Sequence, residues 1–234
     1  MASQSPRSLG ILTLDIGQPH HSVDLEGPGS ILNPASVGCP VILETVPGAW
    51  SERVVRGDPE LATAYVAAAQ RLVERGAIAV SSDCGFTIRH QAAVAASIDV
   101  PVAMSSLLLL PTLLRQLPPR AKIAVLTFDS TSCTDDLLGL DDPDDRARVV
   151  IGGIEGSKYW HDELKYPTPP TDVAAMEADV GECITHLRAR HPEISAILFE
   201  CAGFPLVASA IRYLTKLPVY DITGLCRLMI ASVA

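Results

Sequence analysis

The sequence is poor in aromatic residues and in positive charge. Phe, Trp and Tyr make up 5% of the 234 residues, and 18 Lys and Arg stand against 27 Asp and Glu, which gives a net charge of −9. No cluster of Lys and Arg is longer than Arg188-Ala189-Arg190. Because a protein that binds a nucleic-acid backbone needs a positive surface, we expect no nucleic-acid partner.

Long apolar runs are also missing. The most apolar stretch, residues 100–114, is interrupted by prolines and serines and is shorter than the roughly 20 residues of a transmembrane helix. The first residues are polar, and the apolar residues after them end at Asp15, so no secretion signal of the usual form is recognised. The sequence therefore predicts a cytoplasmic protein without a membrane segment.

Signatures of metals, disulfides and nucleotides are absent as well. The six cysteines include no closely spaced pair, and the six histidines lack the spacing of a metal site. Residues 152–156 contain three glycines but depart from the pattern of a dinucleotide-binding loop, and no P-loop sequence is present. We therefore expect no metal and no organic cofactor, and a functional cysteine is expected to be catalytic.

The residues that are present predict an α/β fold. Apolar residues make up 48% of the chain and charged residues 19%, which is typical of a globular protein. Short β-rich runs alternate with longer amphipathic runs, as in βα units around a parallel sheet. Two helices are clearest, at residues 59–75 after Asp58 and at residues 171–190. Eight strands are predicted, at residues 10–15, 41–45, 77–82, 100–104, 122–128, 147–151, 196–199 and 218–221.

The chain also carries a weak internal repeat. Leu12-Thr13-Leu14-Asp15 resembles Leu126-Thr127-Phe128-Asp129, in the same order along the chain. Cys84 and Cys201 are each followed, after an equal number of residues, by a proline between two apolar residues. The repeat predicts two related halves, each with a cysteine just beyond a buried strand.

The two cysteines stand where a catalytic site is expected. Ligands of open α/β sheets bind beyond the carboxyl ends of strands, so both thiols would face one site. A helix after each cysteine would direct N–H groups there, lower the pKa of the thiol and bind a carboxylate. One thiolate could then remove a proton from carbon while the opposite thiol donates one, without a cofactor. The alternative is that both cysteines merely pack in the core.

Several short motifs resemble the aspartate/glutamate racemase family, whose members need no pyridoxal phosphate. They are Asn33-Pro34-Ala35-Ser36, Val46-Pro47-Gly48-Ala49, Ser81-Ser82-Asp83-Cys84-Gly85-Phe86, Val100-Pro101-Val102 with Ser105-Ser106-Leu107, Val125-Leu126-Thr127 and Phe199-Glu200-Cys201, and together they extend over nearly the whole chain. The wider superfamily includes hydantoin racemases, maleate cis-trans isomerases and arylmalonate decarboxylases. The resemblance implies Cys84 and Cys201 as the acid/base pair.

The same resemblance implies an α/β fold of two pseudosymmetric lobes. Each lobe would hold a parallel four-stranded sheet flanked by helices, and the active site would lie in the cleft between them. We expect residues 1–103 and 221–234 to form the first lobe, which carries Cys84. Residues 104–220 would form the second lobe, which carries Cys201.

The chain departs from the family beside both cysteines. Glutamate and aspartate racemases typically follow the first cysteine with Asn-Thr and the second with Thr or another polar residue. Here Gly85-Phe86-Thr87 and Ala202-Gly203-Phe204 stand in those places. These residues remove polar side chains and add aromatic surface, which favours a substrate less polar than a free amino acid.

The predicted substrate-binding residues lie mainly in the turns after the strands. They are Asp15, Asn33, Gly85, Phe86, Thr87, Thr127, Ser130, Thr131, Ala202 and Gly203. Because these turns hold no Lys or Arg apart from Arg89, a carboxylate would be bound by backbone N–H groups and hydroxyls. The alternative is that the hydroxyls and Asp15 only cap turns and helices. Asp83 and Glu200 are expected to bond nearby backbone rather than the thiols.

Together these observations predict an isomerase that acts on a small anionic molecule. It would be a racemase or epimerase that exchanges the proton next to a carboxylate or carbonyl of a small acid, an amino acid or a related ring. A decarboxylase, cis-trans isomerase or lyase of the same fold that uses one or both cysteines is the first alternative, and a module that only binds a small acid is the second. A homo-oligomer is left open. The aromatic residues gathered in residues 156–167 predict a cover over the cleft or an interface.

Overall fold

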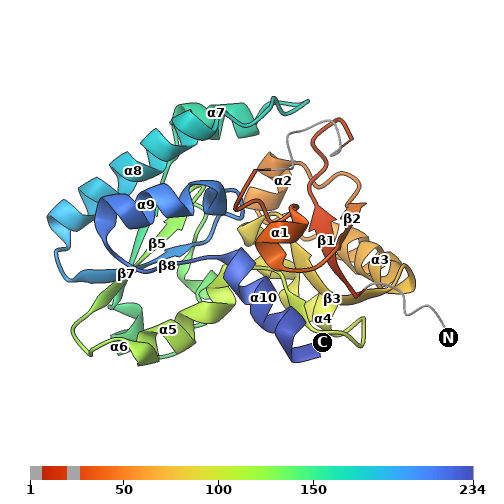
Figure 1. Ribbon diagram of the computed structural model, residues 1–234, viewed down its shortest axis with the longest axis horizontal. Helices are drawn as coiled ribbons and strands as arrows, with labels where there is room; N and C mark the ends of the chain where they lie inside the picture. The colour runs from red at the N-terminus through yellow and green to blue at the C-terminus, as the bar shows by residue number, and fades with distance from the viewer. Residues whose placement is uncertain (1–6, 20–26, 234) are drawn as a thin grey trace.

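Two parallel sheets form the centre of the molecule (Figure 1). The computed structural model describes residues 7–19 and 27–233. The first sheet has the order β2-β1-β3-β4 and the second the order β6-β5-β7-β8, with four parallel strands in each. The strands are β1 Ser8–Thr13, β2 Val41–Thr45, β3 Ala77–Ser82, β4 Val102–Ala103, β5 Lys122–Thr127, β6 Val149–Gly153, β7 Ile194–Phe199 and β8 Val219–Tyr220. The predicted α/β fold with eight strands is confirmed, although β4 and β8 are shorter than expected.

The two sheets repeat one another in detail, as the internal repeat predicted. The pairing of β1 with β3 shifts register between Ser8 and Leu9, and the pairing of β5 with β7 shifts between Lys122 and Ile123. Both shifts occur at the beginning of the central strand. β1 is buried along its whole length, and β5 is buried except at Lys122, because helices cover both faces of each parallel sheet.

The helices follow the amphipathic pattern of the sequence. They are α1 Pro34–Val37, α2 Ser51–Val55, α3 Leu61–Glu74, α4 Gln91–Ala95, α5 Leu110–Gln116, α6 Pro143–Arg146, α7 Lys158–Glu163, α8 Val173–Arg190, α9 Ala208–Thr215 and α10 Ile222–Val233. Short 3₁₀ segments are η2 Gly85–His90, η3 Ser106–Leu109, η4 Asp135–Leu137 and η5 Phe204–Val207. None of the helices in the described ranges has both the length and the apolar character needed to cross a membrane.

The two clearest predicted helices are present with shifted starts. α3 begins at Leu61 rather than Pro59, because the Asp58 carboxylate accepts the Glu60 N–H at 2.9 Å and so caps a turn before the helix. α8 begins at Val173, where the Asp172 side chain accepts the Ala175 N–H at 3.0 Å. Side-chain oxygens at such positions replace the hydrogen bonds that the first turn of a helix lacks.

Contacts between the two halves hold the sheets together. The Ser106 hydroxyl donates a hydrogen bond to the Phe199 carbonyl at the end of β7, and Arg89 donates to the Ser132 carbonyl at 2.9 Å. The last helix, α10, packs back on the first sheet, where Ile222 and Cys226 share an apolar cluster with Leu9 (Figure 1). The carboxyl ends of β3 and β7 consequently meet in one region.

Candidate active site

A cavity of about 440 Å³ lies where the two halves meet. Segments that follow β1 and β3 line one side of it, and segments that follow β5 and β7 line the other. Cys84 and Cys201 both line this cavity, and each side chain is half-buried. The structure therefore brings the two predicted catalytic cysteines to one site, from opposite halves of the chain.

The expected helices after the cysteines are present, and each begins as a 3₁₀ segment. η2 follows Cys84 directly and continues into α4, while η5 begins three residues after Cys201 and continues into α9. Backbone N–H groups still contact the sulfurs, since Phe86 donates to the Cys84 thiol and both Gly203 and Phe204 donate to the Cys201 thiol. These contacts stabilise a thiolate, which was the effect expected of helix N-termini.

The expected lowering of the thiol pKa is nevertheless wrong. Burial raises the pKa of Cys84 well above its ordinary value, and the negative charges of Glu200 and Asp83 raise it further. Burial and Glu200 likewise raise the pKa of Cys201. Since removal from water disfavours the charged form of a thiol, the amide contacts do not compensate, and both thiols favour the protonated form.

Two buried carboxyl groups stand directly before the cysteines. Both Asp83 oxygens lie within hydrogen-bonding distance of the Leu14 N–H, at 3.0 and 3.2 Å, which is the backbone contact expected of this residue. Glu200 also bonds nearby backbone, because the Phe128 N–H donates to its carboxylate; its Oε2 accepts the Thr127 hydroxyl at 2.7 Å, and its Oε1 is buried without a partner. Burial raises the pKa of each carboxyl to about 7. Each therefore changes charge near neutral pH.

A third carboxyl group reaches the cavity from α7. Glu163 lines the cavity beside Tyr159, whose hydroxyl hydrogen bonds to the Glu163 carboxylate. Burial and the charge of Asp83 raise the pKa of Glu163 to about 7. Tyr159 also contacts Phe128 edge to face, with ring centroids 6.4 Å apart. The aromatic residues in the sequence of residues 156–167 predicted a cover or an interface, but neither Tyr159 nor Glu163 as a site residue, since only the fold shows which side chains of this segment line the cavity.

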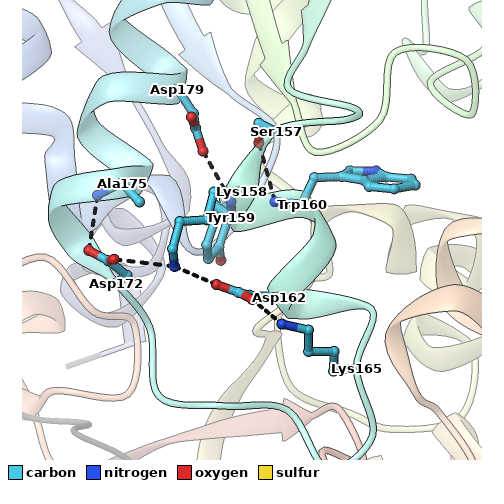
Figure 2. A network of polar contacts seen from close by, with 9 residues as sticks. All are labelled: Ser157, Lys158, Tyr159, Trp160, Asp162, Lys165, Asp172, Ala175 and Asp179. Carbon is cyan, nitrogen blue, oxygen red and sulfur yellow. Dashed lines mark hydrogen bonds and ion pairs between the residues drawn. The ribbon is translucent and has the colours of Figure 1, made fainter.

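A network of charged side chains fixes α7 (Figure 2). Lys158 pairs with Asp162 at 2.7 Å and with Asp172 at 3.2 Å, and Lys165 pairs with Asp162 at 2.6 Å. Because Asp172 caps α8, the Lys158 pair joins the two helices. Asp179 of α8 also accepts the Tyr159 N–H at 3.1 Å. The wall that carries Tyr159 and Glu163 is therefore tied to the long helix α8.

Four of the predicted substrate-binding residues line the cavity: Gly85, Phe86, Ala202 and Gly203. A Cβ atom on Gly85 would lie 2.0 Å from the Glu200 carbonyl oxygen and 2.4 Å from Glu200 Oε1. A Cβ atom on Gly203 would lie 2.7 Å from the Tyr159 hydroxyl and 3.7 Å from the Cys201 sulfur. Backbone and side-chain atoms already occupy that space, so a side chain at Gly85 or Gly203 would require its neighbours to move.

The remaining predicted residues do not line the cavity: Asp15, Asn33, Thr87, Thr127, Ser130 and Thr131. The buried Thr87 hydroxyl lies 2.6 Å from the Cys84 carbonyl and 2.8 Å from the Met104 carbonyl. The Ser130 N–H bonds Glu155 at 3.0 Å, and the Thr131 N–H bonds Asp129 at 2.9 Å. These contacts are of the capping kind that was the alternative for these residues.

Asp15 and Asn33 likewise stabilise their own loops. Asp15 accepts the N–H groups of Gly17 and Gly48, each at 3.2 Å. Asn33 caps α1 through the Ala35 N–H at 2.9 Å. Thr127 is fully buried, and its hydroxyl donates a hydrogen bond to Glu200, which lines the cavity. Substrate contact by these residues stays a prediction.

The cavity is lined by acidic rather than basic side chains, although the predicted substrate is an anion. Three carboxyl groups line it, from Asp83, Glu163 and Glu200. Among the residues that the structure describes, no Lys, Arg or His lines the same cavity. An anion can be bound there only by neutral donors, which are backbone N–H groups and the hydroxyls of lining residues such as Ser30, Ser51 and Thr168, whereas a positively charged group would meet carboxylates.

Known proteins of similar sequence are lyases. A dimethylsulfoniopropionate lyase of Durusdinium sp. clade D is 33% identical over 92% of this chain and 71% of its own length. Dimethylsulfoniopropionate lyase 3 of Emiliania huxleyi is 30% identical over 96% of this chain but only 59% of its own length, so the chain spans about three fifths of that relative. No protein-family model matches the chain.

Solved structures of similar fold include racemases and arylmalonate decarboxylases. The allantoin racemase of Klebsiella pneumoniae is 12% identical, with a TM-score of 0.60 over 96% of this chain and 86% of its own. The aspartate racemase of Picrophilus torridus is 14% identical, with a TM-score of 0.57 over 97% of this chain and 94% of its own. The chain thus has the fold of the aspartate/glutamate racemase superfamily, and the predicted resemblance is confirmed.

Similarity at this level to the Durusdinium protein, over most of both chains, establishes common descent. The names of these relatives agree with the lyase alternative of the sequence analysis rather than with the isomerase. The chain belongs to the family of the dimethylsulfoniopropionate lyases.

Proposed function

We propose that this chain is a lyase that cleaves dimethylsulfoniopropionate into dimethyl sulfide and acrylate. One observation carries the proposal: two thiols and three carboxyl groups line one cavity, among whose described residues there is no Lys, Arg or His. The substrate is a zwitterion, with a carboxylate at one end and a sulfonium leaving group at the other. A cavity of this charge suits that leaving group, and the names of the relatives support it.

The reaction is an elimination that needs one base. A thiolate removes a proton from the carbon next to the carboxylate, and the electron pair of that bond forms the carbon–carbon double bond. The carbon–sulfur bond breaks, and its electron pair leaves with sulfur as neutral dimethyl sulfide. Acrylate remains, and the thiol returns its proton to water. All atoms and charges balance without an oxidant, a reductant or a further reactant.

We assign the base to Cys201. Two backbone N–H groups, of Gly203 and Phe204, hydrogen bond to its sulfur, whereas Cys84 receives one such bond from Phe86. Additional hydrogen bonds favour the thiolate. Cys201 also lies near Gly203, which contacts the Tyr159 hydroxyl on the wall formed by α7. Cys84 would then shape the opposite side of the site.

The substrate itself would help to ionise this base. Burial and the nearby carboxyl groups raise the pKa of both thiols. A sulfonium ion brought into the same cavity adds a positive charge, which favours the thiolate through Coulomb attraction in a site of low dielectric constant. Proton abstraction is thereby coupled to the presence of the correct leaving group.

Racemisation is a second candidate function, and the placement of both cysteines in one cavity favours it. A racemase needs a proton donor and a base on opposite sides of the carbon, whereas the elimination needs only the base. The two functions also give different products: the elimination releases acrylate and dimethyl sulfide, whereas racemisation gives the opposite enantiomer of the substrate.

The proposal is tested by incubating the purified protein with dimethylsulfoniopropionate in heavy water and following the products by proton NMR. We expect acrylate and dimethyl sulfide in equal amounts. A parallel screen of single enantiomers of chiral acids, amino acids and hydantoins is expected to show no inversion. Inversion of any of them, with no acrylate from dimethylsulfoniopropionate, would establish the racemase instead.

A further inference from the structure

The wall of the cavity formed by α7 combines a carboxylate with aromatic rings. Glu163 and Tyr159 project from this helix, and the Phe128 ring stands edge-on to Tyr159 at 6.4 Å. The Tyr159 hydroxyl hydrogen bonds to Glu163, so the two side chains act as one unit. Each of the three residues lines the cavity.

The other two carboxyl groups are less able to contact a ligand. Both oxygens of Asp83 lie near the Leu14 N–H. Glu200 is 1% exposed, and its carboxyl group lies against Gly85. Its Oε1 is nevertheless buried without a hydrogen-bond partner among the described residues. Glu163, which is half-buried, is the carboxyl group best placed to face the ligand.

Such a wall matches a weakly hydrated cation. Onium groups carry their charge on methyl groups, and they bind to the faces of aromatic rings and to nearby carboxylates. The attraction is strongest where water is excluded, because the dielectric constant is low there. A neutral group of the same shape would gain only the burial of its apolar surface.

We propose that Glu163 and Tyr159, with the Phe128 ring, form the subsite for the positively charged onium group of the substrate and select substrates that carry one. This inference rests on the proposed function, because it assigns one end of the proposed substrate to one wall of the cavity. The carboxylate of the substrate then lies toward the N–H groups beside Cys84 and Cys201. The ion pairs of Lys158 and Lys165 hold α7 in place before the ligand arrives.

The test compares two ligands that differ only in charge. The first is trimethylammoniopropionate, in which trimethylammonium replaces the sulfonium group. The second is its carbon isostere, in which a tert-butyl group replaces trimethylammonium. Calorimetric titration of the wild-type protein is expected to give a Kd at least about tenfold lower for the ammonium ligand. Equal affinity, or tighter binding of the carbon isostere, would overturn the subsite even if no variant could be prepared.

Two variants test which residue causes the preference for the ammonium ligand. Glu163→Gln is expected to reduce the affinity ratio of the two ligands to about one, by weakening the ammonium ligand alone. Glu177→Gln removes the same charge from the exposed surface of α8 and is expected to leave the ratio unchanged. A ratio that Glu163→Gln leaves at the wild-type value would show that another group selects the cation, and would overturn the assignment.

The test of the onium subsite and the test of the lyase activity can fail independently. A protein that prefers the ammonium ligand through Glu163 but releases no dimethyl sulfide retains the subsite and loses the lyase assignment. A protein that releases dimethyl sulfide but binds both ligands equally retains the lyase assignment and loses the subsite.

Discussion

Gly85 lies where a side chain of any size would collide with Glu200. A Cβ atom there would come within 2.0 Å of the Glu200 carbonyl oxygen, which is backbone and cannot swing away. We therefore expect Gly85→Ala to lower the free energy of unfolding by about 1–3 kcal/mol, through overpacking. Because the collision moves the residue before Cys201, elimination should also slow. Urea unfolding and the rate of acrylate formation measure the two effects.

Gly224 supplies the matched control for Gly85. It lies in α10, where a Cβ atom would meet no other atom within 4 Å. Gly224→Ala is expected to be neutral or to stabilise the protein by about 0.4–1 kcal/mol, since alanine restricts the unfolded chain and favours a helix. If Gly85→Ala were as stable as Gly224→Ala, the close packing of Gly85 on Glu200 would be wrong.

A site residue could be predicted from the sequence where a reactive side chain follows directly after a predicted strand. Cys84 and Cys201 could be predicted to share a site, because a cysteine after each of two matching strands must reach the same edge. Glu163 could not be predicted, because nothing in the local pattern shows that the last residue of a six-residue helix faces a cavity. Ser130 and Thr131 were expected to bind substrate, but local hydrogen bonds hold both of their N–H groups.

At the scale of elements, α7 is too short to be stable by itself. Its six residues gain stability from contacts outside the helix, and Asp162 is the partner shared by Lys158 and Lys165. These two lysines lower the pKa of Asp162 to about 2, so the side chain is charged at any working pH. The position of Glu163 in the cavity therefore depends on the charge of its neighbour.

We expect Asp162→Asn to raise KM for dimethylsulfoniopropionate by about two- to fivefold, with a smaller change in kcat. The effect should be larger at low ionic strength, since salt screens the exposed ion pairs in the wild type. Steady-state kinetics at two salt concentrations measure it. Glu193→Gln removes the ion pair with Lys122, far along the chain from α7, and should leave KM unchanged. An unchanged KM in Asp162→Asn would mean that α7 needs no such support.

The strands and long helices could be predicted because their patterns depend on local sequence. Buried strands such as β3 and β7 read as apolar runs, and α8 carries one apolar face over its whole length. The 3₁₀ beginnings of the helices after the cysteines were not predicted, and at Gly85 and Gly203 a Cβ atom would collide with Glu200 and Tyr159 from distant segments. Packing across the cavity decides these turns, and no local pattern encodes it.

The whole molecule should be most stable in mildly acidic solution. The folded-state pKa values of Asp83, Glu163 and Glu200 are raised to about 7, from 3.8 for the aspartate and 4.5 for the glutamates. Between about pH 4.5 and pH 7 these carboxyl groups are protonated in the folded protein but ionised in the unfolded chain. The free energy of unfolding therefore falls as the pH rises toward about 7. Burial lowers the pKa of His90 below its ordinary value of 6.5, and this opposes the trend at pH values below 6.5.

We therefore expect a larger free energy of unfolding at about pH 5.5 than at about pH 8, with Glu200 alone contributing on the order of 2 kcal/mol. Urea unfolding at the two pH values measures the difference. Glu200→Gln, which is neutral at both, should reduce it, whereas Glu177→Gln on the exposed face of α8 should not. A wild-type protein that is more stable at pH 8 would contradict the burial of these carboxyl groups without positive partners.

The two lobes contribute unequal parts to the proposed reaction, although their folds match. The second lobe supplies Cys201 as the base and α7 as the wall for the leaving group, and the first supplies Cys84 on the opposite side. A racemase would need the two cysteines equally. The molecule would thus have kept a symmetric fold while using it for a one-sided reaction.

The most direct test measures the initial rate of dimethyl sulfide release from dimethylsulfoniopropionate by the wild type, Cys84→Ser and Cys201→Ser, each checked for folding by its unfolding transition. The account predicts release by the wild type, a loss of about a hundredfold or more in Cys201→Ser, and a rate within about tenfold of wild type in Cys84→Ser. Absence of release by the wild type, or a Cys201→Ser variant as fast as the wild type, would contradict it.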